Sequence, residues 1–323
     1  MKSLRKKIAA FSRASPLVLI LLLNSLPAAS GRPLRRNSNL PSTIARFSRL
    51  QTTPDERAAK LISEGVAALD RNDVAAAREL FRKALEADPR NVTAHTYLGA
   101  LADRAGEFVE AASHFAIAAR LAPTSASTRN NYGAVLLRLG RPTVAAAEFE
   151  ASLRLDPRQP SALVNLAQIR FAEGGTESLR AAQGLFKRAY EIAPDVEIAR
   201  ALTIVSLILK DTAAAAAYFR DYSTRLAAGE GTEATLSAAA RAELGAALFE
   251  AGLLTESAAE LNAALSANPS NVDAILQLAR VYLARKDIPA AGRTLESAVA
   301  RGLDKAPIYA LLAEVYEKSG HIE

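Results

Sequence analysis

The sequence predicts an all-α fold, a solenoid of stacked antiparallel helix pairs with about seven pairs and one extra helix. Three observations support this expectation. The chain repeats itself every 34 residues from residue 54 onward, most repeats close on a proline, and the composition is rich in alanine but free of tryptophan. Alanine favours helices, and its small side chain lets helices approach closely. At 323 residues the chain exceeds one average domain and suits an extended array.

The repeat is defined by five columns of residues that recur at the same spacing. Three consecutive copies align without gaps, giving fifteen matched positions at one fixed period, which is too regular to be accidental. The columns are Gly65, Gly99 and Gly133; Ala77, Ala111 and Ala145; Phe81, Phe115 and Phe149; Ala84, Ala118 and Ser152; and Pro89, Pro123 and Pro157.

Each column has a mechanical explanation. The glycine is expected where one helix crosses its partner closely, and the first alanine fills the tight point on the second helix. The phenylalanine is expected to fill the space between neighbouring helices, and the proline ends the second helix because it lacks a backbone donor. At the start of the array, Thr53, Pro54 and Glu56 predict a capping box with a first-turn proline.

The later repeats are less regular. The fourth has Leu166-Ala167 in place of Leu-Gly and an inserted turn at 174–176, and the fifth keeps only Ala215 and Phe219 of the second-helix columns. The sixth and seventh are regular again. The expected units are 58–91, 92–125, 126–159, 160–195, 196–228, 238–271, 272–305 and a partial unit at 306–323, within a repeat region of 54–323.

This pattern resembles the tetratricopeptide repeat, whose signature has Leu-Gly, a later alanine, a phenylalanine four residues on and a closing proline. The usual early tryptophan is replaced by Leu61, His95 and Arg129. The resemblance implies a right-handed superhelical solenoid that binds other proteins or extended peptides in a groove lined by the first helices. It also implies a scaffold or adaptor, and we expect neither catalysis nor a cofactor.

The groove residues are expected two positions before the glycine column and beside it. Asn131 and Asn165 lie one period apart there, and each amide side chain can both donate to and accept from a peptide backbone. This resembles the asparagine ladder of longer repeat superhelices. The alternative is that both asparagines only hydrogen-bond neighbouring helices. The predicted groove set is Tyr97, Asn130, Asn131, Arg138, Asn165, Gln168 and Arg200.

Other site chemistry is not indicated. The carboxylate clamp of chaperone-binding family members needs lysine and asparagine where this chain has Ile62 and Val66, so that mechanism is not expected. The absence of cysteine excludes disulfides and thiolate metal sites, and no metal-ligand spacing or phosphate loop is found. His95 and His114 are interpreted as packing or boundary residues, and His321 lies near the end of the chain.

The net charge of +6 is unevenly distributed. The first 53 residues carry ten basic and no acidic residues, so the remainder carries 30 basic against 34 acidic residues, and nucleic acid binding is not expected there. Residues 1–30 read as a secretory signal, with an apolar run over 17–23 and cleavage near Ser30. Export to the periplasm or cell envelope follows, with an N-terminal membrane anchor or a mitochondrial-type transit peptide as the alternatives. Residues 31–53 are expected to form a flexible basic linker, so membrane contact is expected only through the N-terminal segment.

The last predicted helix, 307–319, is apolar around most of its surface, and the sequence stops where its partner helix should begin. A solenoid end normally needs a polar cap. Two further hypotheses therefore stand beside the scaffold. The chain could be the substrate-recruiting arm of a larger or truncated enzyme such as a peptide glycosyltransferase, or a self-assembling structural protein that associates through this helix.

Overall fold

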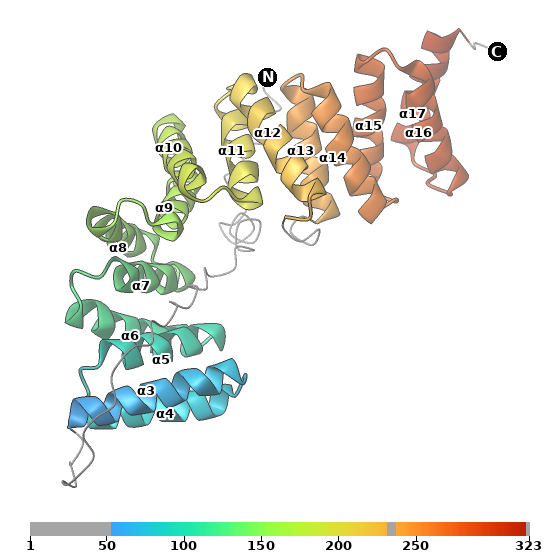
Figure 1. The fold of residues 1–323 in the computed structure, drawn as a ribbon. Coiled ribbons are helices and arrows are strands. Elements are labelled where there is room, and N and C mark those ends of the chain that lie inside the picture. Colours follow the sequence, from blue (N-terminus) through green and yellow to red (C-terminus); the bar gives the residue numbers. More distant parts are fainter. Residues whose placement is uncertain (1–52, 231–236, 321–323) are drawn as a thin grey trace. The chain divides into compact units, whose positions relative to one another are not determined.

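The computed structural model describes residues 53–230 and 237–320, and the regular structure in these ranges is helical throughout (Figure 1). The predicted signal segment at 1–30, nearly all of the predicted linker at 31–53, and His321 lie outside the described residues. The first helices are α3 (Pro54–Asp70), α4 (Val74–Ala87), α5 (Val92–Arg104), α6 (Phe108–Leu121), α7 (Ala126–Arg138), α8 (Pro142–Leu155) and α9 (Pro160–Glu173). The later helices are α10 (Thr176–Ile192), α11 (Val196–Ile208), α12 (Thr212–Ala227), α13 (Ala238–Glu250), α14 (Leu254–Ala267), α15 (Val272–Ala284), α16 (Ile288–Ala300) and α17 (Ala306–Ser319).

The described chain divides into two compact units, and the division falls inside α9, after Ile169. In the first unit α3 packs against α4, and each following helix as far as α8 packs against the helix before it. The second unit shows the same arrangement from α10 to α12 and again from α13 to α17. The prediction of an all-α solenoid of consecutive helix pairs is therefore confirmed for the described residues.

The glycine and phenylalanine columns meet inside each hairpin. A Cβ atom added to Gly99 would lie 2.9 Å from the Phe115 ring, and one added to Gly133 would lie 2.8 Å from the Phe149 ring. Both distances are well inside an ordinary carbon contact of about 3.5–4.0 Å. Phe115 also shares an apolar cluster with Val135 of the next hairpin. The glycine thus makes room for a ring that fills its own hairpin and touches the following one.

The ends of the helices follow the sequence signals. Thr53 N–H donates to Glu56 Oε2 at 3.0 Å while Glu56 N–H donates to Thr53 Oγ1 at 3.3 Å, which is the predicted capping box. Pro89 follows the last residue of α4 by two positions, and the same offset recurs after α6, α8, α10 and α14. These prolines end the second helices because they cannot continue the backbone hydrogen bonding.

The turns within the hairpins place residues in the left-handed region. Asn72, Gly106 and Gly140 hold this position in the first three hairpins, with φ of 60°, 79° and 70°. Two later hairpins place lysines there, Lys210 at φ 61° and Lys286 at φ 60°. Glycine adopts this conformation freely and asparagine tolerates it, whereas lysine pays a steric penalty. The turn column is thus a second periodic feature of the chain.

The last described helix, α17, is less exposed than its sequence suggests. Four of its aliphatic side chains are buried, and they pack with Ile275, Ala291 and Leu295 of the preceding hairpin. Tyr309 and Tyr316 remain exposed, and Tyr316 Oη donates to Glu296 Oε1 at 3.0 Å. The predicted apolar surface of this helix is therefore reduced to two tyrosines and small side chains.

Candidate functional site

The first-helix face is defined here as the surface that α5, α7 and α9 contribute within residues 92–169. It holds six of the seven predicted groove residues, since Arg200 lies in the other compact unit. Tyr97 of α5 is half-buried, and its ring stacks on Phe81 with centroids 4.6 Å apart and planes 1° from parallel. Tyr97 therefore joins the first and second hairpins and presents only part of its ring to this face.

Three asparagines occupy the middle of the first-helix face. Asn130 is buried, with 8% of its surface exposed, whereas Asn131 and Asn165 are each half-buried. Asn165 Nδ2 donates to Asn130 Oδ1 at 3.5 Å, a long hydrogen bond that links α9 to α7. Asn165 therefore does hydrogen-bond a neighbouring helix, as the alternative expected, but its partner there is Asn130 and not Asn131.

Asn131 and Gln168 have amide groups that the described fold does not use. Neither side chain makes a hydrogen bond to another described residue, and both are half-buried rather than fully exposed. Each amide can donate two hydrogen bonds and accept two. Asn165 also keeps one N–H and its side-chain oxygen after bonding Asn130. The first-helix face therefore carries hydrogen-bond donors and acceptors, which an extended peptide backbone would complement.

Arg138 at the end of α7 is already paired. Its guanidinium forms an ion pair with Asp103 of α5 and lies over the Phe108 ring, with Cζ 5.8 Å from the ring centroid. Asp103 is half-buried while Arg138 is exposed. Because Asp103 neutralises its charge, Arg138 acts first as a tie between neighbouring hairpins, and any ligand carboxylate would compete with Asp103.

Arg200 differs most from the sequence expectation. Only 1% of its surface is exposed, and its Nε donates to Glu197 Oε2 at 2.9 Å within α11. The sequence placed Arg200 beside the groove columns, but the buried acid three residues earlier takes its guanidinium into the interior. Without rearrangement, Arg200 is not available to a ligand in solution.

Arg200 is part of a buried charged cluster in the second compact unit. The cluster adds Arg241 and Glu260, whose nearest charged atoms are 3.5 Å apart, and the Tyr222 hydroxyl. Burial raises the pKa of Tyr222 to about 12, and the Glu260 carboxylate adds to the effect. Burial also raises the pKa of Glu260, against the opposing charges of Arg241 and Arg200. This cluster packs inside the protein rather than forming an open site.

The pairing of Arg241 with Glu260 belongs to a pattern that sequence reasoning missed. Residues 19 positions apart, one on each helix of a hairpin, meet in three hairpins. His95 Nδ1 lies 2.9 Å from His114 Nδ1, and Arg129 Nη1 donates to Glu148 Oε2 at 3.1 Å. The signal was available, because Arg129 and Glu148 are oppositely charged at the same repeat positions as the two histidines.

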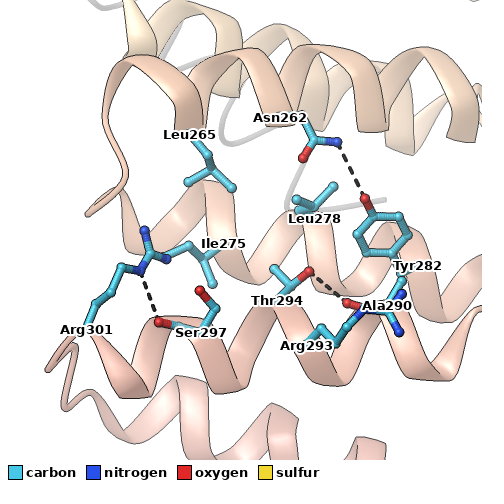
Figure 2. Close-up of a pocket in the computed structure, with 10 residues that line it drawn as sticks. All are labelled: Asn262, Leu265, Ile275, Leu278, Tyr282, Ala290, Arg293, Thr294, Ser297 and Arg301. Atoms are coloured by element: carbon cyan, nitrogen blue, oxygen red, sulfur yellow. Dashed lines mark hydrogen bonds between the residues drawn. The ribbon is translucent and has the colours of Figure 1, made fainter.

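A separate shallow cleft lies on α14, α15 and α16, with a volume of about 310 Å³. Figure 2 shows Tyr282 and Asn262 at one end of it and Arg301 at the other. Asn262 Nδ2 donates to Tyr282 Oη at 3.5 Å, and Arg301 donates from Nε to Ser297 O at 3.0 Å and from Nη1 to Pro269 O at 3.0 Å. These bonds tie the polar side chains to the helices and the turn around the cleft, so the cleft offers little directed chemistry.

The described residues contain neither a three-residue metal cluster nor a helix suited to crossing a membrane. Among residues 53–230 and 237–320, no group of three or more histidine, aspartate or glutamate side chains is placed to hold a metal ion. None of the helices in that part of the chain combines the length and the apolar character that crossing a bilayer requires.

Comparison with known proteins identifies the class. Models of the tetratricopeptide repeat match residues 62–126, 133–197 and 248–315. The chain belongs to the tetratricopeptide repeat family, as its repeated Gly and Phe columns indicate. A comparison with curated proteins found no match.

Three solved structures illustrate the similarity, and one of them has a TM-score above 0.5. A tetratricopeptide repeat protein from Parabacteroides merdae ATCC 43184 is 17% identical, with a TM-score of 0.52 over 80% of this chain and 98% of its own. PilW, a widely conserved type IV pilus biogenesis factor, is 19% identical with a TM-score of 0.48, over 79% of this chain and 98% of its own. An O-GlcNAc transferase from Thermobaculum terrenum is 24% identical with a TM-score of 0.40, over 44% of this chain and 27% of its own. At these identities the first of them shows a shared fold and nothing about the partner.

Proposed function

We propose that this protein is a non-enzymatic scaffold or adaptor that holds an extended segment of a partner protein on the first-helix face. Tetratricopeptide repeats generally mediate protein–protein interaction, which supports the class of function. The observation that carries the specific proposal is the pair Asn131 and Asn165, one period apart, whose amide groups keep hydrogen-bonding capacity that the described residues do not use. Asn131 makes no hydrogen bond to the described residues, and Asn165 spends one N–H on Asn130.

The spacing of the repeat suits an extended peptide. Neighbouring packed helices lie about 8–10 Å apart, and an extended chain rises about 3.3 Å per residue. Successive asparagines would therefore meet backbone amides about three residues apart. Because each contact uses backbone groups, such binding would depend little on the peptide's sequence and would accumulate over several weak contacts.

We also propose that the protein is exported and that its repeats carry no catalytic site. The basic, apolar and small-residue succession over residues 1–30 supports a secretory signal, which would place the scaffold in the periplasm or cell envelope. Asn131, Asn165 and Gln168, the predicted groove residues with spare hydrogen-bonding groups on this face, are amides, and Arg138 is already paired to Asp103. These groups can bind and orient a chain, but they supply no nucleophile or general base.

Peptide binding by a paired set of variants tests the proposal. Fluorescence anisotropy would measure the affinity of the full-length protein for a library of labelled unstructured peptides. The Asn131→Ala, Asn165→Ala double variant removes two amides worth about 1 kcal/mol each, so we expect affinity to fall about 30-fold. The matched control is Ser113→Ala with Thr143→Ala, two exposed polar residues on the second helices α6 and α8, which should bind as the wild type does.

Asn165→Ala also removes the hydrogen-bond donor to the buried side-chain oxygen Oδ1 of Asn130, which could destabilise the fold. Circular dichroism therefore checks that the variants are folded. If both double variants stay folded and every binding peptide retains its affinity for Asn131→Ala, Asn165→Ala, the asparagines are not the binding groups and the proposal fails.

A further inference from the structure

The paired histidines of the second hairpin have a geometry that the proposed scaffold function does not use. His95 lies on α5 and is buried, with 6% of its surface exposed, while His114 lies on α6 and is half-buried. Their Nδ1 atoms face each other at 2.9 Å. Two neutral imidazoles can make this contact only if one Nδ1 donates and the other accepts.

The outer nitrogens decide which histidine donates. His95 Nε2 lies 3.2 Å from the Pro89 carbonyl oxygen, which can only accept, so His95 carries its proton on Nε2 and its Nδ1 lone pair faces His114. His114 Nδ1 is then the donor. On its other side, His114 Nε2 lies 3.9 Å from Glu110 Oε1. The outer nitrogen of His95 is thus at hydrogen-bond distance from a carbonyl oxygen, that of His114 is 3.9 Å from a carboxylate oxygen, and the two Nδ1 atoms converge.

The carbonyl behind His95 is a feature that metal-binding histidines share. A ligating imidazole usually donates its other N–H to a backbone carbonyl or a carboxylate, which fixes the ring and its tautomer. We propose that His95 and His114 form a two-histidine site for a divalent transition metal of the copper or nickel class, with both Nδ1 atoms as ligands and water at the remaining positions.

The distance between the two nitrogens selects the class of ion. With metal–nitrogen bonds of about 2.0–2.1 Å, two ligands at a right angle are about 2.9 Å apart, and two at a tetrahedral angle about 3.3 Å apart. The observed 2.9 Å matches the right angle of square-planar and octahedral ions. Zinc would require the rings to separate by about 0.4 Å.

The proton on His114 does not obstruct binding. When a metal takes Nδ1, the imidazole proton can move to Nε2, which faces Glu110 Oε1 at 3.9 Å, so no net proton needs to leave the site. The side chain of His114 is 19% exposed, which gives the ion a route in.

The chain supplies its own control side chains. The positions of the two histidines are held by Leu61 and Leu80 in the first hairpin and by the ion pair Arg129 and Glu148 in the third. A His95→Leu, His114→Leu variant therefore installs the leucine pair of the first hairpin. A His95→Arg, His114→Glu variant installs the ion pair of the third hairpin, which has no imidazole.

Copper binding to the full-length chain tests the site. All proteins would carry His321→Ala, which removes the remaining histidine. Calorimetric titration with Cu²⁺ should give one site per chain, and electron paramagnetic resonance should show coupling to two imidazole nitrogens. Because loss of supporting groups alone costs about 10–100-fold in affinity, loss of both ligands should weaken binding at least about 100-fold in both variants.

Each outcome decides the question, provided that circular dichroism shows the variants folded. Binding that both double variants lose, with a two-nitrogen spectrum in the parent, supports the site. Binding that survives in the variants places the copper elsewhere, and absence of binding in the parent leaves the pair as an internal hydrogen bond. Either of the last two results overturns the proposal, and neither bears on the peptide-binding function.

Discussion

The close fit of Gly99 against Phe115 gives a prediction in which two opposing effects can be separated. In an exposed helix, replacing glycine by alanine stabilises by about 0.8–1 kcal/mol because alanine loses less backbone entropy. At Gly99 the new Cβ would lie 2.9 Å from two atoms of the buried Phe115 ring. Forcing extra atoms into a packed core costs about 1–3 kcal/mol. We expect Gly99→Ala to lower the free energy of unfolding by about 0–2 kcal/mol.

Gly184 is the matched control, since it lies within α10 and a Cβ there would meet nothing within 4 Å. Gly184→Ala should raise the free energy of unfolding by about 0.8–1 kcal/mol, so the two variants should differ by about 1–3 kcal/mol. Urea denaturation followed by circular dichroism measures both. Because repeat arrays can unfold in parts, amide hydrogen exchange in α5 and α6 adds a local reading.

A third variant tests whether the ring is the cause. The seventh hairpin places Ala279 and Leu295 in the columns that Gly99 and Phe115 occupy, and both are fully buried in one apolar cluster. Phe115→Leu should therefore relieve part of the cost of Gly99→Ala, with a coupling free energy of about 1 kcal/mol. If Gly99→Ala stabilises the protein as much as Gly184→Ala does, the close-packing explanation of the repeat is wrong.

Three other predictions concern single side chains. Lys286→Gly should raise the free energy of unfolding by about 0.5–1 kcal/mol in urea denaturation, because lysine is strained at φ 60°, and no gain would mean that the turn is unstrained. Arg241→Met should lower the free energy of unfolding by about 3–5 kcal/mol, because it leaves Glu260 buried without its partner. The double variant Arg241→Met, Glu260→Leu should recover most of this loss. An equal loss in both variants would contradict a charge effect. Tyr222 has a folded pKa of about 12, above its usual value near 10, so its contribution to stability should be lost as pH rises from about 10 to 12, amounting to about 2–3 kcal/mol. Tyr222→Phe should lack this dependence, and parallel stability profiles for wild type and variant above pH 10 would refute the assignment.

The helices and the hairpin packing could be predicted because they depend on backbone constraints that repeat along the chain. A proline without an N–H and a glycine facing a phenylalanine act the same way in each of the first three copies, so a fixed period reveals them. The turn column shows the limit of this reasoning. Lys286 takes the same positive φ as Gly106 because the hairpin geometry overrides the local preference of the residue.

The candidate site was less predictable because the availability of a side chain depends on its particular partners. Asn131 and Arg200 were selected by position alone. Asn131 keeps its amide unused by the described residues, whereas Glu197 draws Arg200 into the interior. The pairing of His95 with His114 required the spacing between the two helices of a hairpin, which the column alignment did not consider.

The central claim is that the first-helix face holds the partner, and site-specific photo-crosslinking tests it most directly. A photoreactive amino acid would replace Asn131 in one version of the full-length protein and Thr143, exposed on the second helix α8, in another. Both would be irradiated in the native cells, and the covalent adducts would be identified by mass spectrometry. The account predicts that the same partner is captured repeatedly from position 131 and not from position 143. Equal capture from the two positions, or capture from position 143 alone, would contradict it.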